Sequence, residues 1–233
     1  MSNLGILLGK ELRALFSSAV AYAMVAVFLG LLGYTFTTFL FLSKTATLLH
    51  VFFQTSVLFL LMVPVLTMRL FAEERKTGTL ELLLTSPARE IEIVLAKFLA
   101  SMTVVGLMLG LSVTYAVVLG IYGTPDWGPI YAGYLGLVLL GAALVALGLL
   151  VSSLTANQLV AAIASLGLFL LLWMIDTLGY LLPEPFDTLA VNLSLLAHFT
   201  PFATGSLFLS DLGFFVSVTL AALFLSVRAL ARR

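Results

Sequence analysis

A run of 49 consecutive residues without a formal charge, residues 127–175, constrains this chain more than any other feature. At about 1.5 Å per residue, one helix of that length would be far longer than a hydrocarbon core about 30 Å thick. The run must therefore fold back once within a membrane. Its only polar cluster, residues 152–158, predicts the position of the turn.

The chain as a whole is also apolar and poor in charged residues. Hydrophobic residues make up 62% of the sequence and charged residues 9%, whereas a typical soluble domain is about 25% charged. We expect an all-α polytopic membrane protein that forms a single domain over residues 1–233. The absence of cysteine excludes disulfides and thiolate metal sites, two histidines leave little material for a metal centre, and a net charge of zero gives no sign of nucleic-acid binding.

Six spans follow from the apolar segments, at about residues 18–42, 47–68, 98–122, 130–151, 158–178 and 210–230. The uncharged run that contains the first span covers residues 14–43, which is 30 residues. A secretory signal has an apolar region of only about 7–15 residues, so we interpret this run as a retained anchor. Pro64 is expected to bend or end the second span because it lacks a backbone N–H.

An amphipathic helix is expected before the first span, at residues 1–17. Leucines recur there at helical spacing, at Leu4, Leu8, Leu12 and Leu15. Lys10, Glu11 and Arg13 share the other side, a pattern typical of a helix lying in the membrane interface. The alternative is a frayed polar lead-in to the first span.

Residues 179–209 contain prolines and acids between apolar pieces too short to span, residues 189–199 and 202–209. Such segments indicate an outer re-entrant structure, which needs protein or a water-filled cavity around its backbone. Asp176, just before it, either lines a substrate vestibule or marks a solvated helix end. His198 is expected at the outer interface. Ser210 is a plausible N-cap for the last span, with Asp211 at the positive end of that helix.

Basic residues fix the expected orientation. If the N-terminus is cytosolic, ten of the eleven lysines and arginines fall on the cytosolic side and only Lys44 falls outside. No basic residue occurs between Lys97 and Arg228. Both termini are therefore expected in the cytosol.

Catalytic motifs are missing from the sequence. It contains no phosphate-binding GxxxxGK[ST] loop, no HExxH zinc motif and no GxSxG nucleophile elbow. The pair Glu73–Glu74 resembles the EExxxR pattern of an intramembrane protease family, but Gly78 stands where that pattern needs arginine. No ionisable residue lies well inside a predicted span, which favours an energy source outside this chain.

The polar segment, residues 69–97, holds five of the eleven basic and five of the eleven acidic residues. We expect a helix to continue out of the second span as far as Lys76 and to break at residues 77–79. Thr79 is placed to cap a short helix over residues 80–84, and Ser86 followed by Pro87 predicts another helix start. The leucines at positions 80 and 82–84 need a hydrophobic partner, either a protein or, for a simple amphipathic connector, the membrane surface.

The sequence FAEERKTGTLELLLTSP at residues 71–87, followed by EIVLAK at residues 92–97, resembles the signature loop of ABC-2 type permeases. Within that family it is similar to the branch of gliding-motility and nitrous-oxide-reductase-maturation permeases. The pattern of His198, Phe199, Phe202, Gly205 and Asp211 is also similar to that branch.

The resemblance implies a permease subunit in a bacterial inner membrane, with no cofactor of its own. Its partners would be a second permease chain, identical or similar, and two cytosolic ATPase subunits that hold ATP and magnesium. The resemblance also implies that the loop after the second span docks on the ATPase. The residues carried over to that coupling role are Glu73, Glu74, Arg75, Lys76, Thr77, Gly78, Thr79, Leu80, Glu81, Leu82, Leu83 and Leu84.

The function expected from these features is ATP-driven movement of a substrate across the membrane, most simply export. The alternative is a membrane anchor or scaffold that recruits a cytosolic ATPase, or another protein, without transport.

Overall fold

The computed structural model of the chain describes residues 3–79, 81, 88–179, 183 and 186–231. Within these residues every regular element is a helix, and six helices are long and apolar enough to cross a membrane. This confirms the all-α fold and the number of spans. The six are α2 (Ala19–Ser43), α3 (Leu49–Thr77), α5 (Glu90–Tyr122), α6 (Trp127–Leu154), α7 (Gln158–Gly179) and α10 (Leu209–Ala231).

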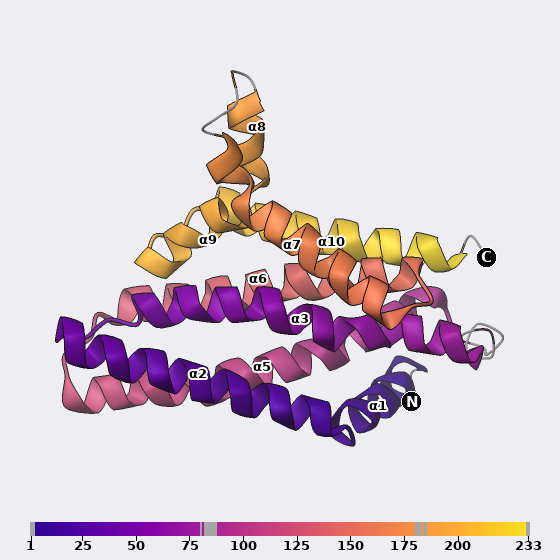
Figure 1. The fold of residues 1–233 in the computed structure, drawn as a ribbon, viewed down its shortest axis with the longest axis horizontal. Coiled ribbons are helices and arrows are strands. Elements are labelled where there is room, and N and C mark those ends of the chain that lie inside the picture. The colour runs from indigo at the N-terminus through magenta and orange to yellow at the C-terminus, as the bar shows by residue number, and fades with distance from the viewer. Residues whose placement is uncertain (1–2, 80, 82–87, 180–182, 184–185, 232–233) are drawn as a thin grey trace.

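Three shorter helices complete the described structure: α1 (Asn3–Phe16), α8 (Phe186–Leu193) and α9 (Leu195–Thr204). The long helices α2, α3, α5 and α6 run along the longest axis of the molecule, and α7 and α10 lie beside them (Figure 1). The last part of α7 and the helix α8 project from the side of this bundle.

Local residue chemistry sets several helix ends. The side chains of Ser18 and Asp126 accept hydrogen bonds from the backbone N–H groups of Val20 and Gly128, which caps the starts of α2 and α6. Gly78 and Gly205 end α3 and α9 with positive φ angles of 72° and 94°, a conformation that favours glycine. The helix expected to run out of the second span therefore ends at the expected break.

Two helices extend into the polar segment from either side. α3 passes through Pro64 without ending and continues beyond residue 68 to Thr77. α5 begins at Glu90, well before residue 98. Hydropathy marks only the part of a helix that lipid can surround, whereas backbone hydrogen bonding continues wherever the helix is not interrupted. At α10 the first helical residue is Leu209, so Ser210 lies inside the helix and Asp211 lies in its first turn, as expected.

α6 forms the centre of the bundle because its glycines let other helices approach closely. A methyl group added at Gly133 would overlap the ring of Phe52, and one at Gly148 would overlap the side chain of Thr67, both on α3. By contrast, a methyl group added at Gly106 on α5, the first glycine of a GxxxG pair with Gly110, would meet nothing within 4 Å among the described residues. The same holds for Gly110, whereas a methyl group added at Gly120, near the end of α5, would lie 2.9 Å from the ring of Trp127.

Residues 179–209, expected to be re-entrant, contain α8 and α9. α9 buries Phe199 and Phe202 completely or almost completely, at 0% and 1% exposure. Phe199 packs edge-on against Phe53 of α3 with ring centroids 6.0 Å apart, and Phe202 lies against Gly136 of α6. α9 is therefore part of the packed core, whereas α8 is mostly exposed and buries Ala190.

Candidate functional site

The two halves of the polar segment lie at the same end of the bundle as the chain termini. The end of α3, the start of α5, α1 and the last turn of α10 gather there (Figure 1). α1 packs against α5 and more lightly against α2. This end of the molecule therefore holds the helices that the sequence associated with a partner protein.

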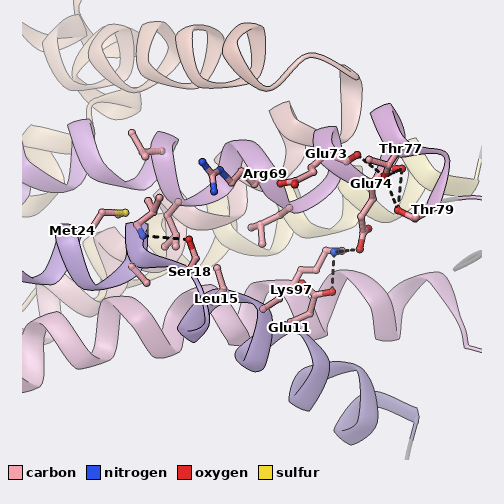
Figure 2. Close-up of a pocket in the computed structure, with 16 residues that line it drawn as sticks. Glu11, Leu15, Ser18, Met24, Arg69, Glu73, Glu74, Thr77, Thr79 and Lys97 are labelled. Atoms are coloured by element: carbon pink, nitrogen blue, oxygen red, sulfur yellow. Dashed lines mark hydrogen bonds and ion pairs between the residues drawn. The ribbon is translucent and has the colours of Figure 1, made fainter.

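A buried lysine joins three of these helices. The side chain of Lys97 on α5 is 1% exposed, and its Nζ lies 2.9 Å from Glu74 Oε1 on α3 and 3.0 Å from Glu11 Oε1 on α1. Figure 2 shows Lys97 between the two carboxylates. The ammonium group also lies 5.2 Å from the ring centroid of Phe71.

The cluster contains equal numbers of positive and negative side chains. Lys10 on α1 is more exposed than Lys97, and its Nζ lies 3.4 Å from the same Glu74 oxygen. Two lysines therefore face two carboxylates. Because removing one partner of a buried ion pair costs about 3–5 kcal/mol, the cluster holds α1, α3 and α5 in one arrangement. The end of α3 is thus joined to the N-terminal helix through Glu74, Lys97 and Glu11.

A serine of α6 provides a second attachment. The hydroxyl oxygen of Ser152 accepts from the backbone N–H groups of Phe71 and Ala72, at 3.2 Å each, and donates to the carbonyl of Met68 at 3.2 Å. The hydroxyl is thus bonded into the turn of α3 that begins the polar segment. The sequence assigned Ser152 to a turn between two spans, and no local pattern indicated this contact.

The structure separates the predicted coupling residues into distinct environments. Glu74 is in the ion-pair cluster, and Arg75 is half-buried and has polar interactions of its own. The exposed ones are Glu73, Lys76, Thr77, Gly78, Thr79 and Glu81. The predicted positions Leu80, Leu82, Leu83 and Leu84 lie outside the described residues, as do Ser86, Pro87 and the terminal pair Arg232 and Arg233.

The predicted role of Thr79 as a cap concerns a helix over residues 80–84, most of which lie outside the described residues. Within the described residues, the hydroxyl of Thr79 donates to the carbonyl of Glu74 at 3.3 Å and lies 2.9 Å from the hydroxyl of Thr77. Thr77 in turn donates to the carbonyl of Glu73 at 3.0 Å. Both threonines therefore satisfy carbonyl groups left open at the end of α3. At the start of α5, the carboxylate of Glu92 accepts from the backbone N–H of Arg89 at 2.9 Å.

A second polar contact lies at the base of the outer segment. Nδ1 of His198 on α9 lies 2.7 Å from Asp211 Oδ1 on α10, and Nε2 lies 3.2 Å from the carbonyl oxygen of Asn192. The imidazole also stacks on Phe214 with centroids 4.0 Å apart. His198 therefore links α8, α9 and α10, a role that its expected interfacial position did not indicate. Among the described residues, no three histidine or carboxylate side chains form a cluster that could hold a metal ion.

Comparison with known protein families identifies the family to which this chain belongs. Residues 54–230 match the family described as ABC-2 family transporter protein. The chain belongs to the ABC-2 transporter family. The match includes the whole polar segment and the His198–Asp211 contact, whereas α1 and α2 precede it. No curated protein matches the sequence. ABC-2 permeases are components of membrane transport that are generally not catalytic themselves, and the family in general implies an ABC ATPase partner.

Proposed function

We propose that this ABC-2 chain is the permease subunit of an ATP-driven exporter in a bacterial inner membrane. ATP and magnesium would be held by two copies of a separate cytosolic ATPase subunit. The likeness of residues 71–87 and of the His198–Asp211 region to gliding-motility and nitrous-oxide-reductase-maturation permeases favours that branch of the family.

The observation that carries this proposal is the attachment of an exposed helix end to buried anchors. Lys76, Thr77 and Thr79 present exposed polar groups at the end of α3. Only a few residues earlier, Glu74 is fixed to α5 and α1 through Lys97, and the backbone of Phe71 is bonded to α6 through Ser152. A force applied by a docked ATPase to residues 73–84 would therefore reach four helices of the membrane body.

The proposal includes a second permease chain, identical or similar. In the most apolar 18-residue stretch of α2, and in that of residues 158–177 of α7, only 17% is buried within the chain. This is the lowest buried share among the six long helices. Large apolar side chains on these helices are exposed, among them Tyr22, Leu31, Ile163 and Met174. These faces would lie against the second chain or lipid. The distribution of lysine and arginine supports a cytosolic position for both termini.

The docking role is tested by charge reversal at exposed positions that leave the buried cluster intact. The full chain, tagged and purified in mild detergent, should co-purify an ABC ATPase and raise its hydrolysis rate. The double substitution Lys76→Glu with Glu81→Lys, combined with Leu80→Asp, should reduce the amount of co-purified ATPase at least about tenfold, since it removes several interface contacts.

Lys44→Glu is the matched control because Lys44 is also exposed and lies beyond the opposite end of α2. This substitution should leave the association unchanged. Undiminished association of the triple variant would show that residues 76–81 are not the docking surface. If the ATPase binds the unaltered chain but its hydrolysis rate is unaffected in reconstituted membranes, the chain acts as an anchor rather than as a transport subunit.

A further inference from the structure

A cavity of about 380 Å³ lies beside the ion-pair cluster, between α1, α2 and α3. One wall is apolar and includes Leu15, Met24, Val65 and Leu66 (Figure 2). Val65 remains 36% exposed, so this wall reaches the outer surface of the bundle. The volume is within the range of about 300–1,000 Å³ typical of small-molecule sites.

The other end of the cavity is charged, and two of its charged residues, Arg69 and Glu73, lie outside the ion-pair cluster. Arg69 and Glu73, one helical turn apart on α3, line the cavity and are both exposed. In the part of the chain that the structure describes, neither forms an ion pair, with the other or with any other residue. Lys97, which also lines the cavity, is already bonded to Glu11 and Glu74.

The position of Arg69 favours a phosphate group. Its side chain and Ser18, which precedes the first residue of α2, both line the cavity (Figure 2). Guanidinium groups bind phosphate through paired, charge-assisted hydrogen bonds, and the start of a helix carries a partial positive charge. Arg69 and the start of α2 therefore offer positive charge to an anion, one helical turn from the carboxylate of Glu73.

We propose that this cavity binds the headgroup of phosphatidylethanolamine from the leaflet next to the chain termini. The phosphate would contact Arg69 and the start of α2, and the ammonium group would donate to Glu73. The acyl chains would follow the apolar wall of Met24 and Val65 to the surface of the bundle. This proposal concerns the chain and its lipid only, and it does not depend on an ATPase partner.

Charge complementarity distinguishes this lipid from its neighbours in a bilayer. An anionic phospholipid such as phosphatidylglycerol would supply the phosphate but would leave Glu73 without a cation. Phosphatidylcholine carries the cation, but its trimethylammonium group has no N–H to donate to a carboxylate. Of these three headgroups, ethanolamine is the one that offers a phosphate to Arg69 and an N–H donor to Glu73.

Native mass spectrometry of the full chain tests the proposal. The protein is released from nanodiscs that contain equal amounts of phosphatidylethanolamine, phosphatidylglycerol and phosphatidylcholine, and the retained lipids are counted. The unaltered chain should retain phosphatidylethanolamine in preference to the other two. Arg69→Gln should reduce its retention about tenfold, the effect of losing one charge-assisted contact. Glu73→Gln should remove the preference for it over phosphatidylcholine while leaving the retention of phosphatidylglycerol undiminished.

Two further variants keep the result interpretable. Lys76→Gln removes a positive charge from the same helix outside the cavity and should retain the lipid as the unaltered chain does. Arg69→Lys keeps the charge and should reduce the retention of phosphatidylethanolamine less than Arg69→Gln does. If Arg69→Gln does not fold, Arg69→Lys is compared with the unaltered chain in its place. Equal retention by Arg69→Gln and the unaltered chain would overturn the proposal. So would a loss of all three lipids in Glu73→Gln, or an unaltered chain without a preference among them.

Discussion

Nζ of Lys97 lies 2.9 Å from Oε1 of Glu74, although the lysine side chain is only 1% exposed. Glu74 lies near the start of the polar segment and Lys97 is its last residue. Their contact therefore brings the two ends of that segment together. Glu11 completes the arrangement from the N-terminal helix, with Oε1 3.0 Å from the same ammonium group. Two charged residues of the polar segment, Glu74 and Lys97, thus lie in a cluster around a buried ammonium group.

Removing the cation should destabilise the protein strongly. Lys97→Met leaves the carboxylates of Glu11 and Glu74 without their main partner, and we expect a loss of about 3–5 kcal/mol in the free energy of unfolding. Denaturant titration in detergent micelles measures it. Lys44→Met, which removes an exposed lysine, should have no measurable effect. The triple variant Lys97→Met, Glu11→Gln and Glu74→Gln should recover part of the loss, and no recovery would contradict an electrostatic origin.

The Ser152 hydroxyl should control the local stability of the end of α3. Ser152→Ala leaves the N–H of Phe71 without its side-chain partner, which should cost about 1–3 kcal/mol. Hydrogen exchange at residues 68–77 should therefore become faster. Ser217→Ala is the matched control because the Ser217 hydroxyl is exposed and bonds only within its own helix, to the carbonyl of Phe214. Unchanged exchange in Ser152→Ala would show that α6 does not restrain this turn.

Glycines of α6 and α5 should respond differently to the same substitution. Gly133→Leu places a side chain where the ring of Phe52 packs, and overpacking of this kind typically costs about 1–3 kcal/mol or more. Gly106→Leu meets open space at its Cβ and should be neutral or slightly stabilising because leucine favours helix. Thermal unfolding of the two variants compares them directly. Similar losses in both would mean that Gly106 is covered in the assembled protein, for example by a second chain.

The contact between His198 and Asp211 should hold the outer helices on α10. Asp211→Ala removes the carboxylate that lies 2.7 Å from Nδ1 of His198. We expect a loss of about 1.5–3 kcal/mol, the usual contribution of a hydrogen bond to a charged group, and faster hydrogen exchange over residues 195–204. His50→Gln changes the other histidine, which is exposed and stacks on Phe39 with centroids 3.9 Å apart. That variant should leave α9 unaffected.

The candidate site was only partly accessible to sequence analysis. Helix breakers and caps act over a few residues, so the end of α3 near Gly78 could be predicted from the sequence around it. The partner of Glu74 could not, because a glutamate in a charged segment has the same local pattern whether it faces solvent or a buried lysine. The same limit applies to His198, whose carboxylate partner follows 13 positions later on another helix.

The sequence by itself determined that the chain lies in a lipid bilayer and has six apolar segments long enough to cross it. It also determined the polar segment between the second and third of these. These follow from the free energy of placing each stretch of side chains in hydrocarbon or in water, a property of neighbouring residues. The tertiary structure alone decided which polar groups are buried and which glycines make contact. Glu11 and Lys97 are 86 positions apart. No periodicity relates such residues, and only the packing of α1 against α5 brings their charges together.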